Sequence, residues 1–416
     1  MTTPADLTTD VLIIGAGPAG LTAAATLAPR LDGQVLVLDR EAAAGGIPRH
    51  SDHPGYGIRD LKTFISGPAY ARRLDSNAAG AGARVQTQTM VTGWAGPRTV
   101  EVTSPDGRQR ITARAIILAT GARERPRTAR LIPGDRPDGV YTTGQLQNLV
   151  HLHHRTPGTR AVIVGAELVS WSAAVTLREA HCRPVLMTST HHRPESYAAF
   201  AIPGRLALRL PVATRTRITK ITGRGRVQAV ELEHLDTGTR RTIDCDTVVF
   251  TGDWIPDNEL ARAAGLDMDP ATRGPLIDTA QATSTPGVFA IGNLTHPVDT
   301  ADIAALDGRA VTGHVLRYLR DGAATTAPEI RVLPGDNLLW ISPGRINTAV
   351  TPPRGRLLSW PRHHIRVPTV TIRQNHTTLS RRRLPWPASP GRVFRIPSSL
   401  LAGATAKNGP VTVDIA

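Results

Sequence analysis

The feature that most constrains the fold of this chain is a group of three glycines near its start. Gly15, Gly17 and Gly20 follow the apolar stretch VLII and open an alanine-rich segment, and Asp39 ends the next apolar run. This order predicts a buried strand, a tight turn, a helix and a second strand with a terminal acid. The first glycine permits the turn, the second lets the backbone approach a phosphate, and the third allows close helix packing. We therefore expect a unit that holds the pyrophosphate of a dinucleotide at a helix N-terminus.

The same order of elements occurs a second time. Residues 160–187 repeat the strand, turn, helix and strand of residues 10–39. Each copy is followed by a further apolar run that contains Thr-Gly, at 115–126 and at 247–256. A repeated strand–turn–helix–strand unit with a later strand indicates two dinucleotide-binding-like domains.

The segments around the two copies set the expected domain limits. Residues 84–114 alternate in polarity and contain Asp106-Gly107, which predicts a β-hairpin or a three-stranded meander. Residues 285–319 predict a strand, a loop and a long helix, and past Asp321 short β-like runs are punctuated by Pro and Gly. The predicted fold class is α/β, with two Rossmann-like domains and a small, mostly β C-terminal domain. The predicted limits are 1–128 with 275–322 for the first domain, 129–274 for the inserted domain and 323–416 for the C-terminal domain.

Composition excludes several classes of protein. No apolar run approaches the roughly 18 residues that span a bilayer, and the N-terminus lacks the basic and apolar regions of a signal peptide, so we expect a cytoplasmic protein without a membrane span. The only cysteines, Cys182 and Cys245, exclude a disulfide scaffold and a four-cysteine iron–sulfur site. His151, His153 and His154 are not joined by an acid or a cysteine, so we expect a solvated helix end and no metal site.

The formal net charge of +15 raises the question of nucleic-acid binding. Arginine carries nearly all of the charge, and from Ala327 onward 13 basic residues stand against 3 acidic ones, a net charge of +10. We expect this region to dock an acidic partner protein or an anionic substrate, and nucleic acid to be an unlikely partner. Arg381-Arg382-Arg383 with Trp386 is interpreted as a partner-facing loop rather than as a base-stacking platform.

The glycine motifs resemble those of the two-dinucleotide-domain flavoproteins related to glutathione reductase. The resemblance spans residues 10–320 and rests on GAGPAG at 15–20, Gly45-Gly46, Ala119-Thr120-Gly121 and GVFAIGN at 287–293. It implies that FAD lies across the first domain, with its isoalloxazine ring near Gly292-Asn293 and a helix that starts near Ala301. The group usually has Gly-Asp at this place, and an Asn side chain can also hydrogen-bond a ribityl hydroxyl. The residues expected to hold FAD are Gly15, Gly17, Pro18, Ala19, Gly20, Asp39, Arg40, Gly46, Arg49, Val91, Ala119, Thr120, Gly121, Gly292, Asn293 and Ala304.

The second glycine motif departs from the first. Its equivalents of the second and third glycines are Glu167 and Ser170, and no ribose-binding acid follows Met187. A carboxylate at the phosphate-approach position fills the space and repels a pyrophosphate. His191-His192-Arg193 can still meet a 2′-phosphate, which leaves NADPH open. We expect the domain to keep its fold and to lose nicotinamide binding, so that NAD(P)H is disfavoured.

A second departure follows Gly45-Gly46. In the disulfide reductases of the group two redox cysteines follow the paired glycines, whereas Pro48 and His53 stand at those places here, so no redox disulfide can form. Arginine suits a substrate carboxylate, and histidine suits proton transfer near neutral pH. We expect His50 or His53 to accept a proton and Arg49 or Arg59 to anchor a carboxylate; in the alternative, Arg49 clamps the FAD phosphates. The polar residues gathered on this presumed flavin face are Arg49, His50, Asp52, His53, Tyr56 and Arg59.

Two longer segments look like a narrower branch of the group. Residues 45–74 and 118–147 are similar to the flavin subunits of hydrogen cyanide synthase, opine oxidase and related heteromeric amino-acid dehydrogenases. The resemblance implies an FAD-dependent oxidoreductase that converts the C–N bond of an amine or amino acid to an imine, and whose partner is a second flavoprotein subunit. No cysteine follows Cys245, so the iron–sulfur segment of several members cannot be transferred. The alternatives are an NAD(P)H-dependent flavin reductase of a small molecule or protein acceptor, and a non-catalytic flavin or scaffold subunit.

Overall fold

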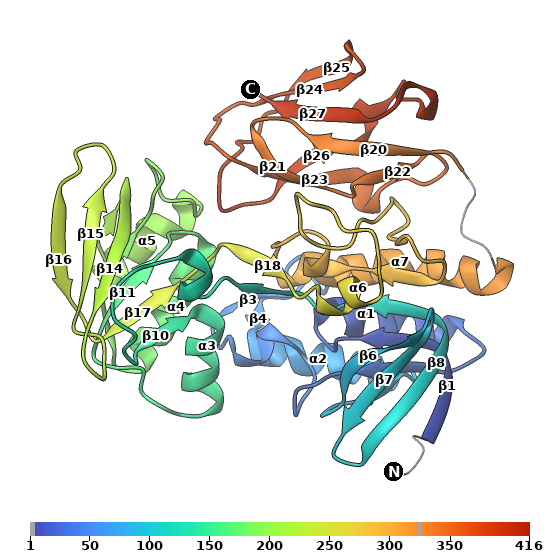
Figure 1. Cartoon of the computed structure of the whole chain (residues 1–416), viewed down its shortest axis with the longest axis horizontal. Coiled ribbons are helices and arrows are strands. Elements are labelled where there is room, and N and C mark those ends of the chain that lie inside the picture. The colour runs from blue at the N-terminus through green and yellow to red at the C-terminus, as the bar shows by residue number, and fades with distance from the viewer. Residues whose placement is uncertain (1–4, 323–326) are drawn as a thin grey trace. The chain divides into compact units, whose positions relative to one another are not determined.

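A computed structural model of the chain describes residues 5–322 and 327–416 (Figure 1). Their contacts separate them into two compact units. The second unit consists of residues 50–53 and 123–255, and the remaining described residues belong to the first. The inserted unit is therefore shorter than the predicted 129–274, because residues 256–274 make their contacts with the first unit.

A largely parallel sheet forms the dinucleotide-binding-like part of the first unit. Its elements are β1 (Ala5–Ile14), α1 (Pro18–Leu27), β2 (Val35–Leu38), β3 (Pro54–Tyr56), β4 (Ile65–Ser66), α2 (Gly67–Gly80), β5 (Arg84–Gln86), β6 (Met90–Gly96), β7 (Thr99–Ser104), β8 (Gly107–Leu118), α6 (Glu259–Ala263), β19 (Val288–Ala290) and α7 (Ala301–Asp321). The strand order is β5-β2-β1-β8-β7-β6, and β19 pairs with β8. Strands β6, β7 and β8 form an antiparallel meander, whereas β1, β2, β5, β8 and β19 pair in parallel. The predicted meander and the predicted helix start at Ala301 are confirmed.

The apolar runs of this sheet are covered on both faces, as a parallel sheet requires. Residues 11–14 and 35–38 are buried throughout. Helices α1 and α7 approach so closely that a Cβ at Gly308 would lie 2.1 Å from the carbonyl oxygen of Ala19. This contact fixes the two helices at the end of the sheet where the glycine turn lies.

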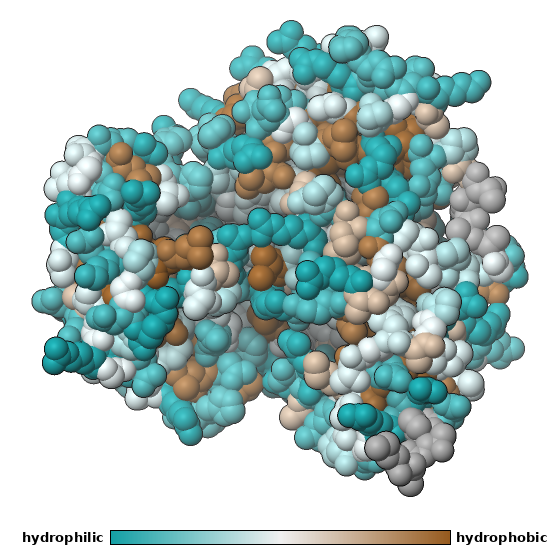
Figure 2. Space-filling view, viewed as in Figure 1, coloured by the Kyte–Doolittle hydropathy of each residue, from teal (hydrophilic) through white to brown (hydrophobic). Residues whose placement is uncertain are grey.

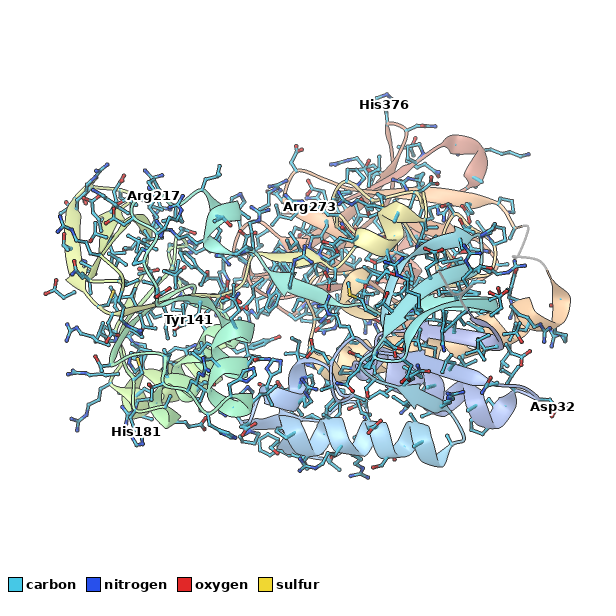
Figure 3. The ribbon with its side chains drawn as sticks, turned by 60° about the horizontal axis from the view of Figure 1, so that its bottom comes forward. Asp32, Tyr141, His181, Arg217, Arg273 and His376 are labelled. Carbon is cyan, nitrogen blue, oxygen red and sulfur yellow. The ribbon has the colours of Figure 1, made fainter. Side chains whose placement is uncertain are left out.

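The second unit repeats the parallel architecture with a five-stranded sheet of order β10-β17-β11-β12-β13. Its elements are β10 (Val140–Thr142), α3 (Thr143–Gln147), β11 (Arg160–Val164), α4 (Leu168–Glu179), β12 (Arg183–Thr188), α5 (Ala198–Leu208), β13 (Val212–Ala213), β14 (Thr216–Thr222), β15 (Ala229–His234), β16 (Arg240–Asp244) and β17 (Thr247–Phe250). Strands β14, β15 and β16 form a separate antiparallel sheet. Asp32 and His181, labelled in Figure 3, occupy corresponding turns between the helix and the second strand of each unit. The chain passes between the units through β9 (Ala122–Glu124) and β18 (Trp254–Pro256).

The C-terminal part of the first unit is a domain of short strands with its own apolar core. Its strands are β20 (Glu329–Pro334), β21 (Leu338–Ser342), β22 (Arg345–Asn347), β23 (Arg356–Pro361), β24 (Thr369–Gln374), β25 (Thr377–Arg383), β26 (Phe394–Pro397) and β27 (Val411–Ile415). They form a five-stranded sheet, β22-β20-β27-β24-β25, and a three-stranded sheet, β21-β23-β26. Val370, Leu357 and Ile396 are fully buried between them. The predicted fold class, α/β with two Rossmann-like units and a mostly β C-terminal domain, is confirmed.

Candidate functional site

The turn between β1 and α1 is tight at two glycines and open at the third. Gly15 has φ +111°, and a Cβ there would lie 2.4 Å from the carbonyl oxygen of Ala119. A Cβ at Gly20 would lie 1.9 Å from the carbonyl oxygen of Gly15, so both positions require glycine for packing. A Cβ at Gly17 would meet nothing within 4 Å, and α1 starts at Pro18 without a side-chain cap. Space is therefore left in front of the helix N-terminus, where backbone N–H groups attract anions.

Asp39 holds the same turn from the end of β2. Its Oδ2 accepts a hydrogen bond from Ala16 N at 2.7 Å, and its Oδ1 accepts one from Glu41 N at 2.9 Å. Burial raises the pKa of Asp39, and the two backbone hydrogen bonds oppose that rise. Arg40, the next residue, is exposed and pairs with Asp257 at 3.3 Å.

The loop that follows β2 folds back over the turn. Gly45 N donates to the carbonyl oxygen of Ala16 at 2.8 Å. A Cβ at Gly46 would lie 3.0 Å from Gly17 Cα, so the paired glycines allow two backbone segments to approach closely. The two glycine motifs, which are about thirty residues apart in sequence, form one backbone surface.

Arg49 faces this loop. Its Nη1 donates to the carbonyl oxygen of Ala43 at 2.7 Å, and its Nη2 lies 3.3 Å from Glu41 Oε2. Its Nε is buried and has no hydrogen-bond partner among the described residues. The Arg49 guanidinium therefore keeps one unmatched N–H donor at the loop that follows β2.

The Thr-Gly segment after β8 lies beside the turn. Ala119 N donates to Ile14 O at 2.8 Å, and Thr120 Oγ1 donates to Asp257 O at 2.7 Å. Asp257 N donates in turn to the carbonyl oxygen of Gly121 at 2.9 Å. Val91, on β6, has its side chain in the apolar core on the opposite face of the sheet from α1.

The Asn293 side chain joins the two ends of the segment before α7 by hydrogen bonds to the backbone of Asp299. Gly292 has φ +67°, and a Cβ there would lie 2.9 Å from that of Ala19 and 3.5 Å from that of Ala304. Asn293 Nδ2 donates to Asp299 O, and Asn293 Oδ1 accepts from Asp299 N, each at 3.1 Å. The amide can make further hydrogen bonds, because each bond uses one of two donors or one of two acceptor lone pairs.

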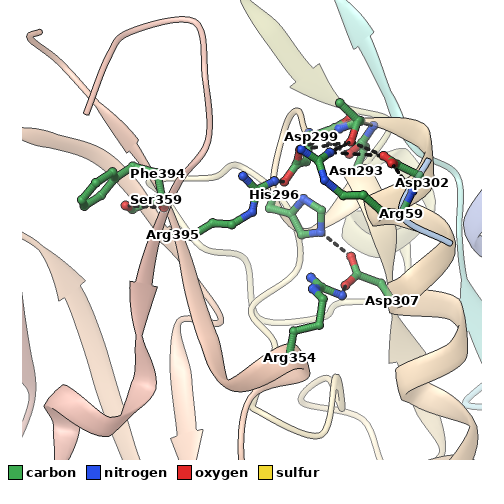
Figure 4. A network of polar contacts seen from close by, with 11 residues as sticks. Arg59, Asn293, His296, Asp299, Asp302, Asp307, Arg354, Ser359, Phe394 and Arg395 are labelled. Atoms are coloured by element: carbon green, nitrogen blue, oxygen red, sulfur yellow. Dashed lines mark hydrogen bonds and ion pairs between the residues drawn. The ribbon is translucent and has the colours of Figure 1, made fainter. Parts of the chain in front are cut away.

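Arg59 reaches the first turn of α7 (Figure 4). Its backbone N donates to Asp302 Oδ2 at 3.1 Å, and its Nη1 donates to Thr300 Oγ1 at 3.1 Å and lies 3.5 Å from Asp302 Oδ1. Thr300 also donates to Asp302. The buried Asp302 carboxylate therefore orients a guanidinium whose side chain is 46% exposed.

Two further acids near α7 bind arginines of the C-terminal domain, and sequence reasoning missed them. Asp307 is 2% exposed and lies 2.5 Å from His296 Nε2 and 2.7 Å from Arg354 Nη1. Asp299 pairs with Arg395 at 2.7 Å. Burial alone would raise the pKa of Asp307, but the charges of His296 and Arg354 together lower it. The only sequence signal was a pair of acids flanking a predicted helix start, and their partners follow 47 and 96 residues later.

The predicted polar cluster after Gly45-Gly46 is divided between the two units. Arg49 and Arg59 belong to the first unit, whereas residues 50–53 belong to the second. Ser51 Oγ lies 3.0 Å from His53 Nε2 and accepts from Gln147 Nε2 at 3.3 Å. His50 is 7% exposed.

The expectation of a solvated helix end is wrong for His151. Its side chain is 9% exposed and lies between two acids, 3.4 Å from Asp52 and 3.6 Å from Glu179. His153 and His154 are exposed as expected. No group of three or more His, Cys, Asp or Glu side chains that can hold a metal ion occurs in residues 5–322 and 327–416.

The second glycine turn is filled by the side chain of Glu167. Its Oε2 accepts hydrogen bonds from Ser170 Oγ at 2.8 Å and from Thr251 Oγ1 at 2.9 Å. A Cβ at Gly252 would lie 2.0 Å from Glu167 Oε1. The Glu167 carboxylate therefore reaches from the start of α4 to the end of β17. The corresponding space in the first unit, at Gly17, is open.

A second buried carboxyl group lies in the loop after β12. Ser196 N donates to Ala166 O at 3.0 Å, which repeats the bond from Gly45 N to Ala16 O. Glu195 Oε2 accepts from Ser189 Oγ at 2.9 Å. Burial, reinforced by the nearby Glu167 charge, raises the pKa of Glu195 to about 8. Two acids therefore line the turn that would have to receive a pyrophosphate.

Glu195 predicts a pH dependence of stability. The folded chain keeps this proton up to about pH 8, while the unfolded chain releases it near the usual value of 4.5. The resulting stabilisation is complete below pH 4.5 and is lost as the pH rises through 8. We expect Glu195→Gln to abolish this loss, so that the variant is more stable than the wild type at high pH. Thermal unfolding at several pH values measures this difference, with Glu101→Gln, at an exposed side chain of β7, as the control. Parallel wild-type and Glu195→Gln curves of stability against pH would refute the prediction.

In the described ranges no helix is both long and apolar enough to cross a bilayer. The two Rossmann-like units differ at their glycine turns: the turn is open in the first unit and is filled by the Glu167 side chain in the second.

Comparison with known proteins identifies the class to which this geometry belongs. The chain is 28% identical over 313 residues to thioredoxin reductase from Treponema pallidum, an alignment that covers 73% of this chain and 95% of the relative. It is 25% identical over 339 residues to one of the subunits of opine oxidase from Agrobacterium tumefaciens, which covers 74% of this chain but only 64% of that relative. The crystal structure of T. acidophilum thioredoxin reductase matches with a TM-score of 0.63 at 22% identity, over 76% of this chain and 99% of that one. A family model described as pyridine nucleotide-disulphide oxidoreductase matches residues 9–308. The chain therefore belongs to the pyridine nucleotide-disulphide oxidoreductase family of flavin-dependent oxidoreductases.

Proposed function

We propose that this protein is an FAD-dependent dehydrogenase that oxidises the C–N bond of an amine or amino acid to an imine, and that it takes electrons from this substrate rather than from NAD(P)H. The observation that carries the proposal is the Glu167 carboxylate, which fills the second nucleotide turn and bonds Ser170 and Thr251. Pro48 and His53 stand where the disulfide reductases that the sequence resembles carry two redox cysteines. The similarity to opine oxidase also supports an amine substrate.

The first unit fits FAD. The space in front of Gly17 accepts a pyrophosphate, and the buried Nε of Arg49 offers a donor beside the same loop. Gly292 and Asn293, at the start of the segment that leads to α7, are proposed to meet the ring and the ribityl chain. When bound, FAD supplies the hydride acceptor that amine oxidation requires.

The remaining steps belong to side chains of the protein. Amine oxidation removes a hydride from carbon and a proton from nitrogen, so a base is needed. We propose Arg59 as the anchor of the substrate carboxylate, with Asp302 as its positioning residue. His50 or His53 is proposed as the base from the sequence pattern alone, since both histidines belong to the second unit. Arg49 is proposed to bind the cofactor, a role supported by its contacts with the loop that follows β2.

Flavin reduction tests the electron source. The purified holoprotein is mixed anaerobically with amino acids, with simple amines, or with NADH or NADPH, and the long-wavelength absorbance of the flavin is followed. We expect bleaching by at least one amine and none by either nicotinamide. Bleaching by NADPH alone would overturn the proposal.

The second candidate is an NAD(P)H-dependent flavin reductase. The family name and the thioredoxin reductase relative favour it, and His191-His192-Arg193 follows β12, where a 2′-phosphate would be met. It requires that Glu167 move away from Thr251, and a nicotinamide titration of the Glu167→Gly variant distinguishes the two. Binding by the variant and not by the wild type supports the dehydrogenase; equal binding by both supports the reductase.

A further inference from the structure

The C-terminal domain contains an arginine-rich groove that the proposed chemistry does not use. The groove has a volume of about 490 Å³ and is open to solvent. Its position is set by the ends of three strands: β25 and the segment after it, the start of β23 and the end of β26. The residues that line it are Arg354, Gly355, Arg356, Arg382, Arg383, Leu384, Pro385, Trp386 and Pro397.

The charge of the groove is largely uncompensated. Arg354 pairs with Asp307, but Arg356, Arg382 and Arg383 have no ion-pair partner in residues 5–322 and 327–416. The domain offers only Glu329, Asp336 and Asp414 as acids, and Glu329 already pairs with Arg345 at 3.2 Å. On the face drawn in Figure 2, hydrophilic side chains gather over β24 and β25 at the outer edge of this domain. Arginines that line one groove without acids favour a ligand with several carboxylates or other anionic groups.

The form of the groove favours a peptide over a nucleic acid. Single-stranded nucleic acids bind on exposed aromatic faces, but the guanidinium of Arg356 already lies over the Trp386 ring, 5.6 Å from its centroid. The walls are Pro385, Pro397 and Leu384, which suit the side of an extended chain. The volume lies within the roughly 300–1,000 Å³ of ligand sites and exceeds what one isolated anion fills.

We propose that this groove docks an extended acidic segment of a partner protein. Glutamate or aspartate side chains of the segment pair with Arg356, Arg382 and Arg383, and its backbone lies along the proline walls. The site is independent of the oxidation proposed above, because it needs neither FAD nor the amine. It lies next to the Arg354–Asp307 pair, so docking occurs where the C-terminal domain is joined to α7.

The test uses the whole 416-residue chain and fluorescence anisotropy at low salt. The probe is a labelled extended peptide with glutamate at alternating positions, compared with its glutamine counterpart. We expect the glutamate peptide to bind about tenfold or more tightly than the glutamine peptide, because each charged pair adds more than a neutral one. Arg382→Glu/Arg383→Glu should weaken it by about tenfold or more.

The matched control is Arg362→Glu/Arg366→Glu, which changes the net charge of the same domain by the same amount outside the groove. Both variants should unfold at the wild-type temperature, since all four side chains are exposed. Equal weakening by the two double variants, or no binding of the glutamate peptide, would overturn the proposal. Tighter binding of a single-stranded oligonucleotide than of the glutamate peptide would also overturn it. So would displacement of the labelled peptide by tripolyphosphate as effective as its displacement by the unlabelled glutamate peptide.

Discussion

The Gly17→Glu variant is expected to purify without FAD and yet to unfold at the same denaturant concentration as the wild-type apoprotein. A Cβ at Gly17 meets nothing within 4 Å, and the backbone φ of −81° is open to any residue, so the fold accepts the side chain. The carboxylate would stand where the pyrophosphate approaches. Two unit charges about 4 Å apart repel by about 4 kcal/mol at an effective dielectric constant of about 20, close to a thousandfold in affinity. The second unit carries this arrangement naturally, with Glu167 at the corresponding place.

Two glycine variants separate loss of cofactor from loss of fold. Gly80→Glu makes the same substitution at an exposed glycine of α2 whose Cβ also meets nothing, and it should keep FAD. Gly15→Ala should lose both FAD and stability, because φ is +111° and the new Cβ would lie 2.4 Å from the Ala119 oxygen. FAD content by absorbance and denaturant unfolding of the apoproteins measure the two effects. Stoichiometric FAD in Gly17→Glu would mean that the pyrophosphate does not lie at this turn.

The local units of the fold were predictable because their signals lie within about thirty residues of one another. Gly15 and Gly20 could be assigned to packing, since a turn between a buried strand and a helix leaves no room for side chains. The start of α7 could be predicted from a polar segment that precedes a long helical pattern. The second unit could be recognised as a copy because each apolar run recurs in the same order.

The long-range contacts could not be predicted, because a single sequence does not specify which distant groups pair. His151 was expected in solvent, but Asp52 reaches it from about a hundred residues upstream. In the order β22-β20-β27-β24-β25 only β24 and β25 are consecutive in the chain, and alternation of polarity does not identify a strand's neighbour. The polar cluster around His50 was predicted as one group because its members are adjacent in sequence, and the structure divides them between two units.

The Asp307→Ala variant should be among the least stable single substitutions in the first unit. The carboxylate is 2% exposed and pairs with both His296 and Arg354, so its removal leaves a buried imidazole and a partly exposed guanidinium without their common partner. Removal of one partner from a buried ion pair costs about 3–5 kcal/mol, because the charge that remains has lost its compensation. Asp321→Ala, which removes an exposed partner of Arg320, should leave the unfolding transition unchanged.

The stability lost in Asp307→Ala should depend on pH, whereas a loss caused only by a cavity should not. The pKa of Asp307 is lowered in the folded protein, so the stability it contributes is present above the usual value of 3.8 and is lost as the pH falls through the lower folded-state value. The gap between wild type and Asp307→Ala in denaturant unfolding should therefore narrow as the pH is lowered toward and below that value. Asp307→Asn, which keeps the shape and removes the charge, should lose most of the same stability, and Arg354→Met should lose less because His296 still pairs with the acid. A pH-independent gap would assign the loss to packing alone, and the Arg354 pair would then have no part in holding the C-terminal domain against α7.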